Sequence, residues 1–268
     1  MKSSRKLYLG HFLVFLVVIG CLIASFWQFS RLSERKDLNE KISKAMQSKP
    51  IDLPQELFGQ DSKDTIVEYE YRPVEITGEY IEDSDVLVAG RTFEGQPGFN
   101  VLTAFKTVNE DVIIFINRGW ISQNLGDSII DKKVNRSVIE PSQGCNTQRT
   151  VVGLFRKNES KRLLTTSKLN KETRVSTLIS SEVLKDGLQT NYAELAANFW
   201  IQEDHSIIDG KKVAKSSPSK EVFPKQILFP ELNERNHLSY AIQFLSFALI
   251  AIITWIVILR KQRKVSHK

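Results

Sequence analysis

The sequence predicts a membrane α-helical hairpin, made of two transmembrane helices, that carries a mostly β, α+β extracytoplasmic domain folded as an antiparallel barrel or sandwich. Residues 7–29 and 238–259 are apolar and contain no Asp, Glu, Lys or Arg. Each stretch has about the 20 residues that a helix needs to cross ~30 Å of hydrocarbon. Residues 30–237 are polar overall and hold short β-branched runs separated by turn residues, which predicts the β-rich domain.

Basic residues flank the two apolar stretches at the chain ends, and positive flanks of short segments tend to stay in the cytoplasm. We therefore expect residues 1–6 and 260–268 to be cytoplasmic and residues 30–237 to be extracytoplasmic, in a two-pass protein of the bacterial cytoplasmic (inner) membrane. Residues 18–21 resemble a lipoprotein cleavage box, but the apolar run continues past Cys21 to Phe29, which favours an uncleaved anchor. The basic flanking residues are Lys2, Arg5, Lys6, Arg260, Lys261, Arg263 and Lys264.

The composition argues against nucleic-acid binding, thiol redox chemistry and copper delivery. These basic clusters account for the formal net charge of +6, so the charge indicates topology and membrane lipid rather than nucleic acid. Cys21 lies in the first apolar stretch and Cys145 in the middle domain, so the two should not form a disulfide. Neither belongs to a C-x-x-C pair, which leaves thiol redox chemistry and copper delivery without their usual ligands.

The first helix is expected to continue past the apolar stretch to about residue 47, before Pro50 and Pro54. Strands are then expected at residues 71–80, 86–93, 100–108, 112–121, 150–156 and 199–202, with a hairpin tip at Asn109-Glu110 and a break at residues 95–98. Residues 178–188 and 192–197 read as short helices. Residues 127–148 and 210–220 read as exposed or polar loops.

The chain lacks the common catalytic motifs: it has no G-x-S-x-G, no P-loop, no G-x-G-x-x-G and no H-E-x-x-H. His205 is the histidine well inside the middle domain, beside Glu203 and Asp204. We expect an exposed loop histidine there rather than part of a catalytic set. The sequence therefore predicts a protein that is not an enzyme and has no catalytic residues.

His237 stands just before the second apolar stretch, where Asn236 is a plausible N-cap. The positive end of the helix dipole would disfavour imidazolium, and neutral imidazole is the form that ligates metals, including haem iron. The alternative is that His237 satisfies backbone groups at the membrane interface. His11 is expected near the opposite end of the membrane, too far away for both histidines to bind one iron.

The first apolar stretch ends with Trp27, Gln28 and Arg31, at the depth expected for His237 and Tyr240. Trp27 and Arg31 fall one helical turn apart on one face, where they would suit a carboxylate-bearing amphipathic ligand. Taken by themselves, Trp and Arg at this position more often serve as interfacial anchors. Arg118, in Asn117-Arg118-Gly119-Trp120, is expected either to bond carbonyls in a packed corner or to bind a partner or a propionate.

Taken in order, several segments resemble the surfeit-1 family. Residues 26–31 are similar to the motif that closes the family's first span, and residues 71–80, 98–104, 117–121 and 152–156 are similar to successive blocks of its outer domain. Residues 236–241 are similar to the start of its second span. The resemblance runs from end to end and includes the two-span layout.

This resemblance implies an assembly factor for haem-copper cytochrome c oxidase that assists haem a insertion into the catalytic subunit. It implies transient binding of haem a, with His237 as the iron ligand and Trp27, Gln28, Arg31, Tyr240 and Arg118 as further cofactor-binding candidates. The expected partners are the catalytic subunit and haem a synthase. A cofactor-free membrane scaffold that stabilises an oxidase subunit is the alternative, and an exported hydrolase is a third hypothesis without a visible catalytic set.

Overall fold

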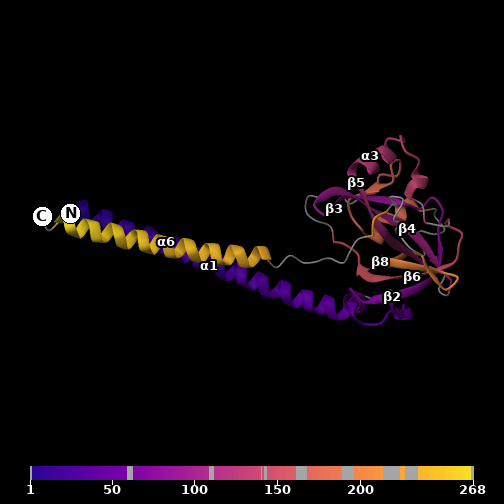
Figure 1. Ribbon diagram of the computed structural model, residues 1–268, viewed down its shortest axis with the longest axis horizontal. Coiled ribbons are helices and arrows are strands. Elements are labelled where there is room, and N and C mark those ends of the chain that lie inside the picture. Colours follow the sequence, from indigo (N-terminus) through magenta and orange to yellow (C-terminus); the bar gives the residue numbers. More distant parts are fainter. Residues whose placement is uncertain are drawn as a thin grey trace. The chain divides into compact units, whose positions relative to one another are not determined.

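The computed structural model describes residues 2–58, 63–108, 112–139, 141, 144–160, 168–188, 196–213, 224–226 and 235–266. The chain forms two compact units, which Figure 1 shows as a pair of long helices and a β-rich domain. Residues 1–43 and 230–268 make the first unit, and residues 44–229 make the second.

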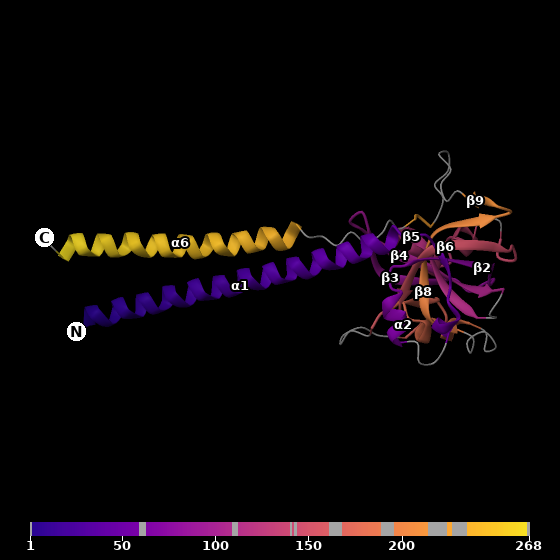
Figure 2. The same ribbon diagram turned by 90° about the horizontal axis from the view of Figure 1, so that it is seen from below.

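The first unit consists of α6 (Arg235–Ser266) and of α1 (Lys2–Met46) up to residue 43, and the two helices run alongside each other in both Figure 1 and Figure 2. Within them, Tyr8–Met46 and Leu238–Lys261 are long and apolar enough to cross a membrane. Large apolar side chains along both helices are exposed, among them Phe12 at 57% and Leu249 at 58%. Such exposed apolar surface is unusual for a helix in water and fits a two-pass membrane protein.

A nine-stranded mixed sheet builds the second unit, with strand order β1-β2-β6-β8-β5-β4-β3-β7 and β9 paired to β8. The strands are β1 (Ile51–Asp52), β2 (Pro73–Tyr80), β3 (Val86–Phe93), β4 (Gln96–Thr107), β5 (Ile113–Ser122), β6 (Arg149–Lys157), β7 (Val175–Ser176), β8 (Ala196–Ile208) and β9 (Lys211–Val213). An additional pairing of β2 with β4 closes a circuit through β2, β6, β8, β5 and β4.

The closure depends on a close backbone approach at Gly78, which pairs with Thr107. A Cβ atom at Gly78 would lie 2.1 Å from the carbonyl oxygen of Lys106, so any larger residue would push the two strands apart. The expectation of a purely antiparallel barrel or sandwich is only partly met. The pairs β1–β2, β3–β7 and β5–β8 are parallel, and four strands lie outside the closed circuit.

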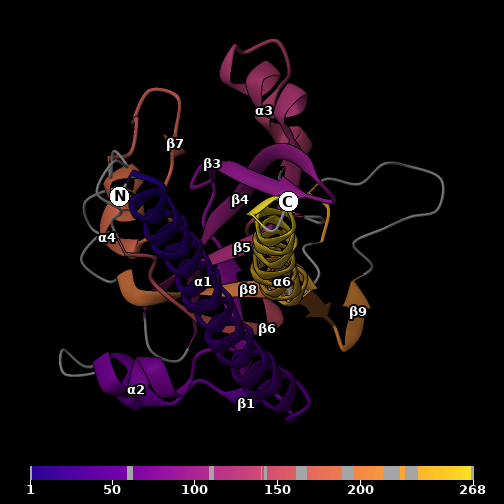
Figure 3. The same ribbon diagram turned by 90° about the vertical axis from the view of Figure 1, so that its left-hand side faces the viewer.

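The short helices lie around the sheet. They are η1 (Gln55–Phe58), α2 (Lys63–Glu68), α3 (Gln123–Ile130), η2 (Arg136–Ile139), α4 (Ser181–Leu184) and η3 (Lys185–Gly187). Figure 3 shows α3 and α2 on opposite sides of the domain. The prediction of an exposed loop over residues 127–148 is wrong for α3 and η2. The Ser122 side chain caps α3 by accepting from Leu125 N–H, and Ile129 and Ile139 are buried in the core.

The strands predicted at residues 71–80, 86–93, 112–121 and 150–156 hold to within two residues. The other two are longer than predicted, because β4 begins at Gln96 and takes in part of the expected break, and β8 runs from Ala196 to Ile208 rather than over residues 199–202. The turn before β4 is Glu94-Gly95, both with positive φ as in a type I′ hairpin.

The polar loop predicted at residues 210–220 begins with the strand β9 instead. Residues 192–197 were expected to be helical, but Ala196 and Ala197 belong to β8, and the rest of that segment lies outside the described residues. The expected hairpin tip at Asn109-Glu110 also lies outside them.

Three hydrophobic clusters form the core of the domain. One includes Phe105, Phe155 and Phe199, and a second packs α4 and Trp200 against β3 to β5. The third joins α3 and η2 to β3, β4 and β5. Many strand residues are buried on both faces, as the run Ile113 to Ile116 shows, which is typical of a sheet covered on both sides.

Candidate functional site

Two hydrogen bonds fix the register of the helix pair. Trp255 Nε1 donates to His11 Nδ1 at 2.9 Å, and Ser25 Oγ donates to the carbonyl oxygen of Ala241 at 3.1 Å. His11 and Ser25 are 14 residues apart, as are Ala241 and Trp255, so the helices run antiparallel in one continuous register. Polar bonds of this kind join helices in membranes, where they have no water to compete with them.

Position 237 can be placed from this register, although the structure does not describe its side chain. It lies four residues before Ala241 and is therefore level with residue 29, four residues after Ser25. The expected depth match between the start of α6 and the end of the first apolar stretch thus holds. The helix starts at Arg235, so Asn236 lies within the first turn rather than at the N-cap position predicted for it.

The residues at this end of α1 lie on two different faces. Ser25 and Gln28 are buried at 2% and 9% exposure, and their spacing of three places them on the stripe that packs against α6. Trp27 is 56% exposed, and Arg31 shares its face one turn further on. Gln28 therefore belongs to the helix contact, whereas Trp27 and Arg31 face outward beside it.

Besides Trp27, the side chains of Tyr240 and Arg31 are accessible near position 237. Tyr240 is 51% exposed on α6. On α1, the guanidinium of Arg31 forms an ion pair with Glu34, 2.6 Å between Nη1 and Oε2, with both side chains more than half exposed. An exposed pair of this kind contributes at most about 1 kcal/mol, so an incoming carboxylate can replace Glu34 at little cost.

His11 lies at the other end of the helix pair. Its bonding partner Trp255 stands about five turns beyond position 237 on α6, roughly 27 Å away at ~1.5 Å per residue. The two rings also meet edge to face, with 5.1 Å between centroids. His11 and His237 therefore cannot meet at one metal ion within this helix pair.

Arg118 is a core residue of the β domain. Its side chain is 5% exposed, and Nη1 donates to the carbonyl oxygen of Ile139 at 2.7 Å and to Thr103 Oγ1 at 3.2 Å. Asp85 Oδ1 lies 3.5 Å away, and the guanidinium stands over the ring of Tyr80. The sequence left open whether Arg118 bonds carbonyls in a packed corner or binds a partner or propionate. The observed contacts are those of a packed corner.

Tyr80 lies between two guanidinium groups, because Arg149 covers its ring as well, 5.0 Å from Cζ to the ring centroid. Burial, followed by the negative charge of Glu203, raises the pKa of Tyr80 well above its usual value. The Tyr80 hydroxyl has no hydrogen bond of normal geometry among the described residues. Burial likewise lowers the pKa of Arg149.

His205 does not lie in a loop, as the sequence suggested, but within β8. Its Nδ1 is 2.7 Å from Asp204 Oδ2, and Asp204 also accepts from the Gln226 side chain. Among the described residues, no group of three or more His, Cys, Asp and Glu side chains is placed to hold a metal ion.

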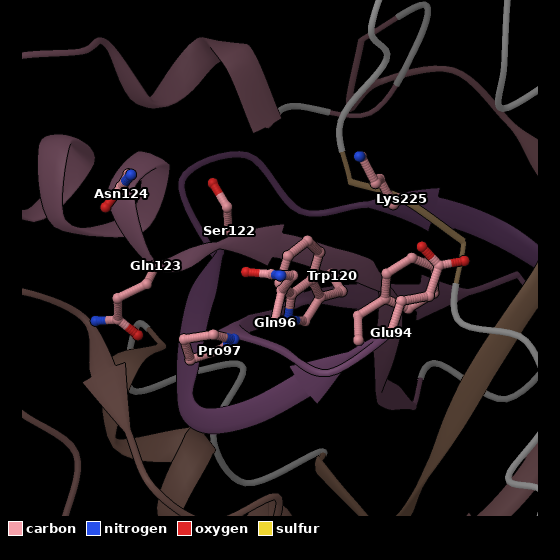
Figure 4. A pocket seen from close by; sticks show the side chains of 9 residues that line it. Glu94, Gln96, Pro97, Trp120, Ser122, Gln123, Asn124 and Lys225 are labelled. Carbon is pink, nitrogen blue, oxygen red and sulfur yellow. The ribbon is translucent and has the colours of Figure 1, made fainter.

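A pocket of about 360 Å³ lies where Trp120 meets the β3–β4 turn (Figure 4). Trp120 forms its floor and stacks on Phe93, 5.3 Å between ring centroids. The backbone of Trp120 pairs with Lys225 through two hydrogen bonds of 2.8 and 2.7 Å. Polar side chains from both sides complete the lining, namely Glu94, Gln96, Ser122, Gln123 and Asn124.

Comparison with known proteins decides the family. A model of the SURF1 family matches residues 15–249. The chain belongs to the SURF1 family. The match includes Trp27, Arg118 and His237, and it begins after His11.

Similar SURF1-like proteins occur in Rickettsia. The one from Rickettsia conorii is 26% identical over 254 residues, which is 94% of this chain and 91% of the relative. The one from Rickettsia felis is 28% identical over 249 residues, 91% and 95% of the two chains. The yeast "Cytochrome oxidase assembly protein SHY1" is 28% identical over 120 residues, 45% of this chain and 29% of the yeast protein. These findings confirm the SURF1 resemblance seen in the sequence.

Sequence reasoning missed the residues that hold the helix pair together. Gly10, Ser25 and Trp255 were not singled out, although polar groups inside an apolar stretch are a known signal of helix contacts. A Cβ atom at Gly10 would lie 2.2 Å from the Trp255 ring, so only glycine admits the indole there. On α6, the small residues Ala241 and Ala248 are also buried, and Ala241, Ala248 and Trp255 follow one another at intervals of seven residues.

Proposed function

We propose that this SURF1-family protein assists the assembly of a haem-copper cytochrome c oxidase, at the step where haem a enters the catalytic subunit. The observation that carries the proposal is the family match over residues 15–249, which takes in part of both apolar helices and the whole domain between them. The yeast relative named for cytochrome oxidase assembly supports the same role. The protein acts by binding and presenting, not as an enzyme.

The haem a site is formed by the ends of α1 and α6 around position 237. His237 would bind the haem iron, Trp27 and Tyr240 would provide exposed aromatic surface, and Arg31 would provide a cation for a propionate. The exposure of Trp27 and Tyr240 and the weak Arg31–Glu34 pair fit such a ligand. Gln28 supports the helix contact. Haem a supplies an iron that accepts an imidazole and two carboxylates that accept hydrogen bonds.

The proposal also includes the membrane, the topology and the partners of the protein. The chain is a two-pass protein of the bacterial inner membrane, with both termini in the cytoplasm and the β domain outside. The catalytic subunit of the oxidase receives the haem, and haem a synthase is the partner that provides it.

The test is to purify the full chain from cells that also synthesise haem a and to measure bound haem by absorption spectroscopy. The wild-type chain is expected to carry haem a, and His237→Ala is expected to lose most of it. His205→Ala is the matched control, because it removes an imidazole that belongs to the β domain and is bonded to Asp204 there. Equal haem content and an unchanged spectrum in His237→Ala would remove the ligand assignment.

A cofactor-free scaffold is the second candidate. The burial of Arg118 favours a scaffold. Arg118 was one expected partner of a haem propionate, and its side chain is bonded within the domain instead. A scaffold captures the oxidase catalytic subunit equally well from membranes with and without haem a, whereas the haem-dependent role predicts stronger capture when haem a is present.

A further inference from the structure

A second cavity, of about 780 Å³, opens on the β domain. It lies between the bulged part of β3, the end of β6 and the residues that follow β7. Its volume is in the range of sites that bind small molecules. Its charged lining residues are Glu70, Arg91, Arg156, Lys157 and Glu159.

Both carboxylates of this lining already have cationic partners. Glu159 accepts two hydrogen bonds from the Nη atoms of Arg91, at 2.8 and 2.7 Å, and a third from the backbone N–H of Ile179. Glu70 Oε2 lies 2.8 Å from Lys157 Nζ. These two pairs account for every charged residue of the described lining except Arg156.

Arg156 is held in place by aromatic rings rather than by a carboxylate. Its guanidinium carbon lies 4.5 Å from the ring centroid of Tyr71 and 5.1 Å from that of Trp200. The one hydrogen bond it makes among the described residues is a long one, 3.5 Å from Nη1 to Gln202 Oε1, and its Nε has no partner there. Contacts of this kind hold a guanidinium without using its N–H donors, and its Nη groups can then bind a ligand.

The backbone holds both rings of the aromatic slot, Tyr71 and Trp200, beside Arg156. Arg156 on β6 pairs directly with Trp200 on β8. The position of Tyr71 is fixed by its backbone N–H, which donates to the carbonyl oxygen of Phe155 at 2.9 Å. A planar donor group that is already oriented loses little conformational freedom when an anion binds.

We propose that this cavity is an oxyanion-binding site, in which Arg156 receives a carboxylate or phosphate group of a small ligand. The Arg91–Glu159 pair shows within the same cavity how a guanidinium here binds a carboxylate through two donors. The excess of one positive charge in the described lining matches one anionic group. The inference is independent of haem binding and of the helix ends.

The test is equilibrium dialysis of the full chain in non-ionic detergent against radiolabelled succinate in one arm and radiolabelled phosphate in the other, at fixed ionic strength. One saturable site per chain is expected with at least one probe, and the better probe identifies the group. Arg156→Gln should weaken that binding roughly tenfold or more. Arg72→Gln is the matched control, because Arg72 also stacks on a tyrosine, 5.4 Å from the Tyr69 centroid, but lies outside this lining.

A second variant tests the cavity without altering the Arg156 slot. Glu159→Gln removes a negative charge from the lining and frees Arg91, so the affinity for the same probe should rise severalfold. Absence of saturable binding with both probes, equal affinity in Arg156→Gln, or unchanged affinity in Glu159→Gln would each overturn the proposal.

Discussion

Trp255 donates a hydrogen bond from its indole nitrogen to Nδ1 of His11 and so joins the two apolar helices near the chain ends. Because His11 accepts at Nδ1, its neutral ring carries the proton on Nε2. A histidine inside an apolar span invites a functional reading. In this structure His11 helps to hold the helix pair in register, together with Ser25 and Ala241.

The helix register can be tested at two glycines of the same helix. Gly10→Ala should weaken the helix pair, because the new methyl group would lie 2.2 Å from the Trp255 ring and force the indole away. Gly20→Ala is the control, since no atom lies within 4 Å of a Cβ at that position. Thermal unfolding of the full chain in detergent should show a lower midpoint for Gly10→Ala alone. Equal midpoints would contradict the register.

Arg118 should matter for stability rather than for ligand binding. Arg118→Met removes one half of a buried pair and leaves Asp85 and the Ile139 carbonyl without their cation, which should cost about 3–5 kcal/mol of unfolding free energy. Lys133→Met, which removes an exposed ion pair with Asp131, should leave stability nearly unchanged. Denaturant titration measures both. A fully stable Arg118→Met chain that has lost its haem would instead assign Arg118 to the ligand.

The raised pKa of Tyr80 predicts how the stability of the fold depends on pH. Its pKa is raised in the folded protein, so the folded state keeps the phenol proton at pH values where the unfolded chain, with a tyrosine pKa of about 10, releases it. This group stabilises the fold fully below about pH 10, and that contribution is lost as the pH rises further. In Tyr80→Phe the fall in stability above about pH 10 should be shallower.

At neutral pH, Tyr80→Phe should be at least as stable as the wild type, because the buried hydroxyl lacks a well-formed hydrogen bond. Denaturation midpoints of both chains from pH 7 to pH 11 check this. Parallel curves for the two chains over that range would show that Tyr80 does not contribute to the pH dependence.

Chemical labelling of a native cysteine can test the proposed orientation of the protein in the membrane. Cys145 forms no disulfide and is half-buried in the β domain, whereas Cys21 lies within α1. A membrane-impermeant maleimide added to intact spheroplasts should label the wild-type chain and should fail to label Cys145→Ser. Labelling of Cys145 only after the membrane is broken would place the domain in the cytoplasm.

The sequence predicted the elements whose signal is local. The two spans follow from length and apolarity, and β2, β3, β5 and β6 follow from β-branched runs between turns. The helix α3 was missed because its apolar residues are few and gain their burial from η2 and the sheet. Residues 196–197 read as helical by composition, yet pairing with β5 and continuity with β8 make them a strand.

The candidate site was predictable in depth but not in detail. Helix rise and span length placed Trp27, Tyr240 and position 237 at one level. The sequence did not show that Gln28 faces α6 while Trp27 and Arg31 face away, since that depends on which stripe the second helix contacts. Arg118 was ambiguous for a similar reason, because Ile139 and Asp85 reach it only through the folded sheet.

The most direct test of the assembly role measures haem a in the oxidase itself. Membranes from host cells with and without this chain are compared for the amount of haem a per catalytic subunit. We predict that loading falls without the chain, is restored by the wild type and by His205→Ala, and is restored less by His237→Ala. Equal haem a loading with and without the chain would contradict the proposed function.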